Sequence, residues 1–106
     1  MRSRRLLEIR EKVLEVLRDL ARDLGAEVYL FGSYARGDHV LDSDVDIVVV
    51  SPRFRGMKYL DRVEMVRLRL PSEIGFDIIP LTPEEFERKK RLAFFKSISR
   101  YWIKIA

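Results

Sequence analysis

The sequence predicts an α/β (α+β) protein: one small domain with a mixed β-sheet and flanking helices, in the order α-β-β-α-β-α. Three observations support this fold class. The chain has 106 residues, the size of one domain, so we expect the domain to span residues 1–106. Hydrophobic residues make up 47% of the chain, which is enough for a core. Their spacing changes several times between the three-to-four-residue repeat of helices and the two-residue repeat of strands.

The first 24 residues have the pattern of an amphipathic helix. Ser3 is suited to cap its start, and Gly25 is suited to end it in a left-handed conformation. Three heptads are too few for a coiled coil, so we expect this helix to pack on a globular core. Its apolar stripe consists of Leu6, Ile9, Val13, Leu17, Leu20 and Leu24.

Three segments rich in β-branched and aromatic residues predict strands, at Glu27–Phe31, Asp44–Val50 and Phe76–Leu81. Pro80 in the third segment indicates a strand end or a sheet edge, because proline cannot donate to a central ladder. The polar segment 33–43 is expected to be mostly irregular, with a helical turn at its start left open.

A second helix is predicted for Tyr59–Leu70 and ends before Pro71. Its apolar side is predicted to consist of Leu60, Val63, Val66 and Leu70.

A third helix is predicted to start at Thr82, which caps it, with Pro83 in the first helical position and Glu85 completing a capping box. We expect it to continue through residues 87–95, with a break in that stretch left open. The tail 97–106 fits either a helix or a short strand.

The connection lengths predict how the strands pair. A short link between the first two strands favours antiparallel neighbours, and the 25 residues from Ser51 to Gly75 suffice for a helical crossover to a parallel third strand. Ser33, Asp44 and Asp77 would then meet at one end of the sheet.

Two acidic residues at the start of the second strand carry the chemistry. Asp44 and Asp46 are two positions apart, so their side chains share a face, about 6 to 7 Å apart. Carboxylates on an otherwise apolar strand are costly unless a cation or a wet cleft receives them. Clustered Asp suits Mg²⁺ shared with phosphates, and two ions about 3.5 to 4 Å apart could clamp an in-line phosphoryl or nucleotidyl transfer. Gly32 and Ser33 fit a phosphate cradle, because glycine lets an anion approach the backbone.

Residues 30–50, LFGSYARGDHVLDSDVDIVVV, resemble the minimal nucleotidyltransferases of the DNA polymerase beta superfamily. The signature of that family is Gly-Ser, ten residues, and Asp-x-Asp, with a third Asp on a later strand. Gly32-Ser33, the ten residues 34–43 and Asp44-Val45-Asp46 match it, and Asp77 matches the third acid. The resemblance covers about residues 25–81 and implies the family's small mixed-sheet fold.

The resemblance also implies a role for each matching residue. Asp44 and Asp46 would bind the Mg²⁺ ions that hold a nucleoside triphosphate, and Asp77 would complete the metal site and help to activate the attacking hydroxyl. Gly32 and Ser33 would hold the triphosphate.

Arg36, in the family's Ser-x-x-Arg-Gly variant, would assist in holding the triphosphate. The resemblance further implies transfer of AMP from ATP to a tyrosine of a partner HEPN ribonuclease toxin, with this chain as the antitoxin. The short chain leaves no room for an acceptor domain, so we expect the acceptor on that partner.

Two other phosphate or metal motifs are excluded. The acids from Asp42 to Asp46 imitate the start of a calcium loop, but Ile47 and Arg53 stand where that loop needs Gly and Glu. No glycine-rich loop is followed by Gly-Lys-Ser/Thr, which excludes a Walker P-loop.

Several other residues are interpreted as structural rather than functional. His39, the one histidine, is interpreted as a solvated loop residue rather than a substrate contact. The basic run Arg88–Arg91 is interpreted as a solvated face rather than a phosphate or RNA contact. Tyr101 and Trp102 are interpreted as packing residues. Whether Arg53, Arg55 and Lys58 contact a nucleotide or a partner is left open.

The composition adds broader expectations. Charged residues make up 36% of the chain, with a net charge of +4, and neither Asn nor Gln occurs, a bias that predicts a heat-adapted source. The absence of Cys excludes disulfides, thiolate metal sites and a Cys nucleophile. Without a membrane-length apolar run or a signal sequence, we expect a cytoplasmic protein with no membrane contact. Direct nucleic-acid binding is not expected, and a homodimer is left open.

Two alternative functions are kept beside nucleotidyl transfer to a protein. One is an antitoxin that binds nucleotide and acts by contact, without catalysis. The other is nucleotidyl transfer to a small molecule or to an RNA end, which would need a dimer or a partner to complete the acceptor pocket.

Overall fold

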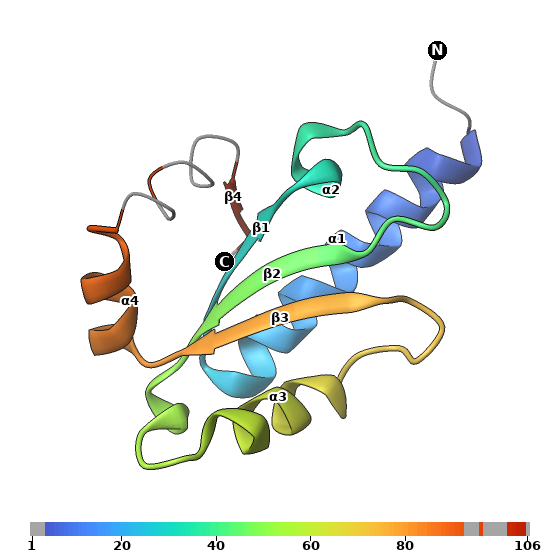
Figure 1. Cartoon of the computed structure of the whole chain (residues 1–106). Coiled ribbons are helices and arrows are strands. Elements are labelled where there is room, and N and C mark those ends of the chain that lie inside the picture. Colours follow the sequence, from blue (N-terminus) through green and yellow to red (C-terminus); the bar gives the residue numbers. More distant parts are fainter. Residues whose placement is uncertain (1–3, 93–95, 97–101, 106) are drawn as a thin grey trace.

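The computed structural model describes residues 4–92, 96 and 102–105, and these form a four-stranded sheet with helices on both faces (Figure 1). The helices are α1 (Arg4–Leu24), α2 (Ser33–Arg36), the 3-10 helix η1 (Pro52–Phe54), α3 (Tyr59–Arg67) and α4 (Pro83–Lys89). The strands are β1 (Glu27–Phe31), β2 (Val45–Val50), β3 (Phe76–Leu81) and β4 (Ile103–Lys104).

The sheet is mixed, as the sequence predicts. Its strand order is β3-β2-β1-β4, with β1 antiparallel to β2, β2 parallel to β3, and β4 antiparallel to β1. The 25-residue crossover through α3 is therefore a connection between parallel neighbours. Pro80 lies in β3, an outer strand, which confirms the expected sheet edge.

One face of the sheet carries the larger core, under α1 and α3. Alternate strand residues turn to this face, and α1 contributes a buried stripe that matches the predicted one over its second half. Gly25 ends α1 with a φ of 56°, the left-handed stop predicted for it. The buried residues of α1 are Val13, Leu17, Leu20, Ala21 and Leu24.

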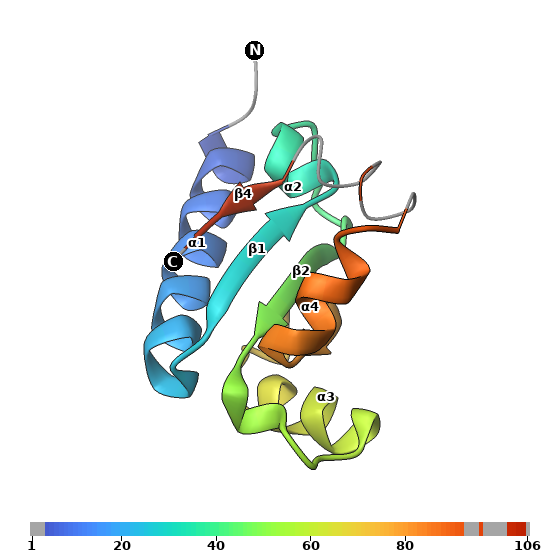
Figure 2. The same ribbon diagram turned by 90° about the vertical axis from the view of Figure 1, so that its left-hand side faces the viewer.

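The opposite face is covered by α4, so that α1 and α4 lie on opposite sides of the sheet (Figure 2). Here Tyr29 stacks on Trp102 with ring centroids 4.6 Å apart, and Phe86 of α4 lies 5.0 Å from Tyr29. Packing was the interpretation given to Trp102; Tyr101 lies outside the described residues.

Several element bounds differ from the predictions. Strand β2 begins at Val45 rather than at Asp44, and α3 ends at Arg67 rather than at Leu70. Helix α4 ends at Lys89, and of the predicted continuation only residues up to 92 belong to the described chain. The tail contains the short strand β4, which settles the alternative left open for it; Ser3 lies outside the described residues.

The prediction that Leu60 lies on the buried side of α3 is wrong, because its side chain is 78% exposed. Arg62 takes the inward position instead and is 9% exposed. Its Nε donates to the carbonyl of Met57 at 3.0 Å and its Nη1 donates to Glu85 at 2.5 Å. An arginine that is bonded at both ends of its guanidinium can be buried, and this turns Leu60 outward.

Candidate active site

The acidic residues of β2 and β3 lie side by side at the start of the parallel strand pair. Asp46 and Asp77 occupy partner positions in the β2–β3 register. Partner positions in neighbouring strands turn their side chains to the same face, which here is the face that carries α4. Of the residues expected to meet at one end of the sheet, Asp77 thus lies beside the Asp-x-Asp motif through its pairing with Asp46.

The environment of Asp46 holds its pKa well above the ordinary value. Burial is the largest cause, followed by a hydrogen bond with the Asp77 side chain and the negative charges of Asp77 and Asp44, and together they raise the pKa of Asp46 to about 6. The negative charge around Asp46 is thus greater than the positive charge that the protein places near it. It is the kind of site that binds a cation or is used in catalysis.

Gly32 lies against the Asp46 carboxylate. Phe31 pairs with Asp46 across the antiparallel β1–β2 ladder, so that Gly32 follows directly at the end of β1. Its φ of 73° and ψ of −153° belong to a region that only glycine adopts readily. A β-carbon at this position would overlap Oδ2 of Asp46. Glycine is therefore required both by the turn and by the carboxylate beside it.

Ser33 and Arg36 form the first and last residues of the short helix α2, which confirms the helical turn left open by the sequence. The guanidinium Nε of Arg36 donates to Oδ2 of Asp38 at 3.1 Å, and its positive charge acts to lower the pKa of Asp46. Arg36 is thus close enough to the acids to act on them electrostatically, while Ser33 sits directly after Gly32.

Asp44 precedes β2 and is placed by a residue that the sequence analysis did not identify. Gly75 has no side chain, and a β-carbon there would overlap Oδ1 of Asp44. The amide of Val45 donates to the carbonyl of Gly75 at 2.9 Å, which fixes the two segments together. A glycine two residues before the third acid is the signal in the sequence that could have found it.

The sequence profile of the nucleotidyltransferase domain family matches residues 10–101. The chain belongs to this family. It is a nucleotidyltransferase, as the signature in residues 30–50 predicted.

Known proteins similar to this nucleotidyltransferase include one from Methanocaldococcus jannaschii, named as a protein adenylyltransferase. It is 22% identical over 101 residues, which cover 89% of this chain and 99% of the relative. A solved structure from Sulfolobus solfataricus, described as a nucleotidyltransferase, superposes with a TM-score of 0.66 and 25% identity, covering 97% of this chain and 87% of the other. A crystal structure of a toxin–antitoxin with AMP-PNP shares the fold, with a TM-score of 0.64 at 21% identity over 88% of this chain and 72% of the other.

The acids of this nucleotidyltransferase fit Mg²⁺ in their chemistry, because carboxylate oxygens are the hard ligands that the ion prefers. The Asp46 carboxylate lies in the space that a β-carbon at Gly32 would need, so this acid is held against the proposed phosphate cradle. Among residues 4–92, 96 and 102–105, no three acidic, His or Cys side chains stand close enough to hold a metal in the present arrangement. Asp46 and Asp77 are in contact with each other, whereas Asp44 is turned to Gly75.

The interpretation of His39 as a solvated residue is wrong, because its side chain is completely buried. Its ring stacks on Tyr34 with centroids 4.3 Å apart, and Nε2 lies 2.9 Å from the carbonyl oxygen of Leu6. Arg10 of α1 donates to the carbonyl of Tyr34 at 2.9 Å. These contacts attach α2 and the loop after it to α1, so that His39 serves to hold the signature loop in place.

The basic residues away from the acids have local partners or lie in solvent. The role of Arg55 was left open by the sequence. In the structure its guanidinium donates two hydrogen bonds to the Glu84 carboxylate, at 2.9 and 2.6 Å. In the basic run, Lys90 pairs with Glu87 and lies over the ring of Phe86. In the part of the chain that the structure describes, no helix is both long and apolar enough to span a membrane.

Proposed function

We propose that this nucleotidyltransferase transfers AMP from ATP to a hydroxyl group of a protein, with Asp44, Asp46 and Asp77 as its catalytic acids. The observation that carries the proposal is the contact between Asp46 and Asp77, with a raised pKa, directly beside Gly32. Two similarities support the choice of substrate. The relative named as a protein adenylyltransferase supports a protein acceptor, and the toxin–antitoxin neighbour solved with AMP-PNP supports an adenine nucleotide.

In the proposed site, Asp44, Asp46 and Asp77 hold Mg²⁺ in one or two positions. Bound there, the ion would neutralise the charge of the phosphates and of the transition state. Gly32, Ser33 and Arg36 would receive the triphosphate, since the glycine leaves room, the start of α2 supplies amides and the arginine supplies charge. Asp44 must turn away from Gly75 to join the other two acids.

The reaction is an in-line displacement at the α-phosphorus of ATP. The acceptor oxygen forms a bond to the α-phosphorus, and the bond from that phosphorus to the bridging oxygen of the β-phosphate breaks. Pyrophosphate leaves with the electron pair, and the hydroxyl proton passes to the Asp77 carboxylate or to water. Most of the rate enhancement would come from positioning and charge neutralisation, as in other phosphoryl chemistry.

We further propose that the acceptor is a tyrosine of a HEPN-domain toxin, which would make this chain an antitoxin. The signature in residues 30–50 and the fold shared with the toxin–antitoxin structure support this partner. The domain proposed here comprises residues 1–106 and would modify its partner in a complex.

The test is incubation with ATP labelled in the α-phosphate, Mg²⁺ and the proposed acceptor, a HEPN-domain protein encoded by a neighbouring gene. We expect label on a tyrosine of that protein, and no label with Asp46→Asn or Asp77→Asn. Asp61→Asn is the control, because Asp61 is an exposed acid of α3 far from the signature. Full transfer by both site variants would sink the assignment of the acids. Undiminished neutralisation of a toxin by Asp46→Asn would instead support an antitoxin that acts by contact.

A further inference from the structure

A pocket beside Asp44 has no part in the roles proposed above. Its volume is about 580 Å³, within the range that holds a large side chain or a small ligand. Four segments enclose it: the N-terminal half of α1, the start of α2, the loop between α2 and β2, and the loop before β3. Asp44 and Gly75 both belong to its wall, so that the pocket reaches one of the three proposed catalytic acids.

The position of the pocket favours the incoming acceptor. Gly32, which begins the proposed phosphate cradle, lies against Asp46, whereas Gly75 and the pocket lie against Asp44. In an in-line displacement the attacking and leaving oxygens lie on opposite sides of the phosphorus. A leaving pyrophosphate held near Gly32 would therefore place the acceptor beyond Asp44, at the sheet edge that the pocket reaches from the α1 side, opposite the face that carries α4.

The lining is apolar at some positions and charged at others, as in sites that receive a protein segment. Ile9, Leu41 and Ile74 supply apolar surface, and Leu41 is 48% exposed. Val40, next to it in the chain, is 58% exposed, which extends the apolar surface outside the pocket. Exposed apolar residues grouped beside a pocket are typical of protein contact sites.

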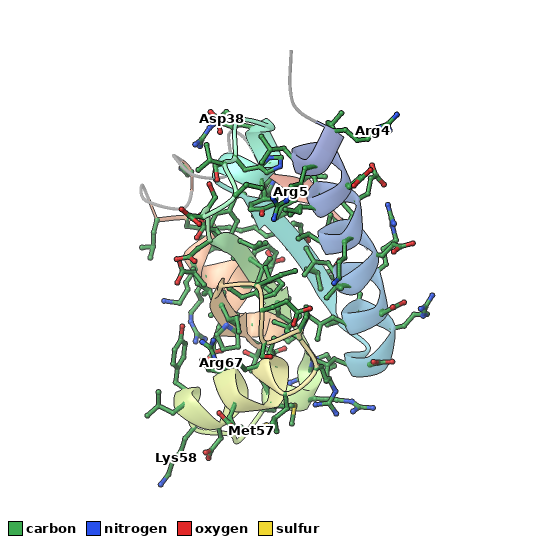
Figure 3. All side chains as sticks on the ribbon, turned by 90° about the vertical axis from the view of Figure 1, so that its right-hand side faces the viewer. Arg4, Arg5, Asp38, Met57, Lys58 and Arg67 are labelled. Atoms are coloured by element: carbon green, nitrogen blue, oxygen red, sulfur yellow. The ribbon has the colours of Figure 1, made fainter. Side chains whose placement is uncertain are left out.

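Two cations of α1 line the pocket, and they differ in their partners. Lys12 pairs with Glu73 at 3.4 Å. The side chain of Arg5 forms no hydrogen bond or ion pair with any of the described residues. Figure 3 shows Arg5 on the side of α1 that faces the loop leading into β2, whereas the neighbouring Arg4 points away from the body of the protein. Three acids, Asp42, Asp44 and Glu73, also line the pocket, but none of them forms an ion pair with the Arg5 guanidinium, which can therefore bind a carboxylate from outside.

The pocket is poorly suited to stack a nucleobase. Its one aromatic lining residue is Tyr34, which is 2% exposed and already stacks on His39. Base sites commonly offer an open aromatic face, and this pocket has none among the described residues.

We propose that this pocket receives the hydroxyl-bearing side chain of the protein acceptor, with an acidic residue of the same segment bound to Arg5. The inference rests on the proposed function and adds to it the acceptor site and the charge of the sequence around the modified residue. Apolar groups of the segment would pack on Leu41, and the hydroxyl would point toward Asp44.

The first test is the charge reversal Arg5→Glu, with Arg4→Glu as the matched control. Both residues are exposed on the same turn of α1, so either change should leave the fold intact. We expect Arg5→Glu to raise the KM for the acceptor protein about tenfold or more, with kcat at saturating acceptor and AMP-PNP affinity by calorimetry nearly unchanged. Arg4→Glu should match the wild type. Equal KM values for the two variants would overturn the inference, and so would a loss of AMP-PNP affinity in Arg5→Glu, which would assign the pocket to the nucleoside.

A second variant tests the apolar contact. Leu41→Ser should raise the same KM, while Leu92→Ser, an equally exposed leucine outside the pocket, should not. After the labelled residue is mapped by mass spectrometry, changing an adjacent acidic residue of the acceptor to Arg should restore transfer by Arg5→Glu. Failure of every such charge swap would remove Arg5 from the acceptor contact.

Binding of the neighbouring protein without ATP separates this inference from the proposed function. If the wild type binds it and Arg5→Glu does not, but no label is transferred, the transferase proposal fails and the pocket assignment stands. If label is transferred equally by wild type and Arg5→Glu, the pocket assignment fails alone. If the neighbouring protein is neither bound nor labelled, both are overturned for that partner.

Discussion

A half-buried carboxylate lies at each end of the parallel pair β2 and β3. The surroundings shift the pKa values of these two carboxylates in opposite directions. At the start of the strands, Asp46 is in contact with Asp77, and its pKa is raised to about 6 by burial and by acidic neighbours. Just beyond the end of β3, Glu85 accepts from Arg62 at 2.5 Å and from the Thr82 amide at 2.8 Å. Those partners, Arg62 above all, hold the pKa of Glu85 below its usual value.

The difference separates a carboxylate that stabilises the fold from one that is available for chemistry. Glu85 completes the capping box of α4 and joins that helix to α3 through Arg62. Asp46 stabilises nothing in this way, since burial and its acidic neighbours oppose its ionised form and outweigh the charge of Arg36. Functional sites commonly retain such unfavourable groups at a cost in stability.

The largest contrast is expected in activity. Asp46→Asn should lower the rate of AMP transfer about 10³-fold or more, because a neutral amide is a much weaker ligand than a carboxylate for the Mg²⁺ that would neutralise the phosphates. Glu85→Gln should change the rate only a few-fold, since that carboxylate lies at the other end of the strands. Single-turnover labelling with α-labelled ATP measures both rates. Comparable losses in the two variants would show that the acids at the start of the strands have no special role.

The next contrast is between two glycines with positive φ. Gly32→Ala forces a side chain into a glycine-only conformation and against Asp46, at a cost of about 1–3 kcal/mol, and should lower transfer about 100-fold. Gly25 also has a positive φ, but a β-carbon there would meet no atom within 4 Å. Gly25→Ala should therefore lower the stability of the protein and leave the rate of transfer unchanged. Thermal unfolding and labelling together distinguish the two. Wild-type activity in a folded Gly32→Ala protein would contradict this assignment of Gly32.

A third contrast concerns the ion pair of Arg62 with Glu85, beyond the end of β3, and the more exposed pair of Arg55 with Glu84. Arg62→Met leaves the Glu85 carboxylate without its main partner and should lower the free energy of unfolding by about 2 kcal/mol, less than a fully buried pair because Glu85 is partly exposed. Arg55→Met removes the exposed pair with Glu84 and should change stability little. Urea unfolding of both variants provides the comparison. Equal stability of the two variants would mean that burial of the Arg62 pair makes no difference.

The smallest contrast is in pH dependence, and the two carboxylates should have opposite signs. For Asp46, the folded pKa lies above the unfolded value of 3.8, so its contribution to stability falls as the pH rises from about 4 through about 6. For Glu85, the folded pKa lies below 4.5, so its contribution is present above that pH and is lost as the pH falls.

Asp46→Asn should therefore gain stability over the wild type between pH 4 and pH 7. Glu85→Gln should lose more stability at pH 7 than at pH 4. Unfolding in the absence of Mg²⁺ measures both differences, and parallel pH profiles for the two variants would contradict the comparison.

Local sequence was sufficient for much of the fold and for the family. The capping box at Thr82 and Glu85 forms as predicted, because its partners are three residues apart. The alternation in residues 45–50 sets the two faces of β2, and the signature in residues 30–50 was confirmed by the family match. The heat-adapted source inferred from composition stays a prediction.

Features that depend on distant residues were the ones missed. The side of α3 that turns inward was predicted wrongly at Leu60, since Arg62 finds its partners in Glu85 and the carbonyl of Met57. The burial of His39 depends on the carbonyl of Leu6, 33 positions earlier in the chain. No pattern within one helix or loop contains that information.

The sequence by itself determined which residues could carry the chemistry, because spacing and residue type are local properties of the chain. Only the tertiary structure decided how those residues differ from one another. It brought Asp77 against Asp46, turned Asp44 toward Gly75 and left Arg5 unpaired over a pocket. The physical reason is that the charge state of a carboxylate and the availability of a cation are set by burial and by neighbours, and those neighbours come from other strands and helices.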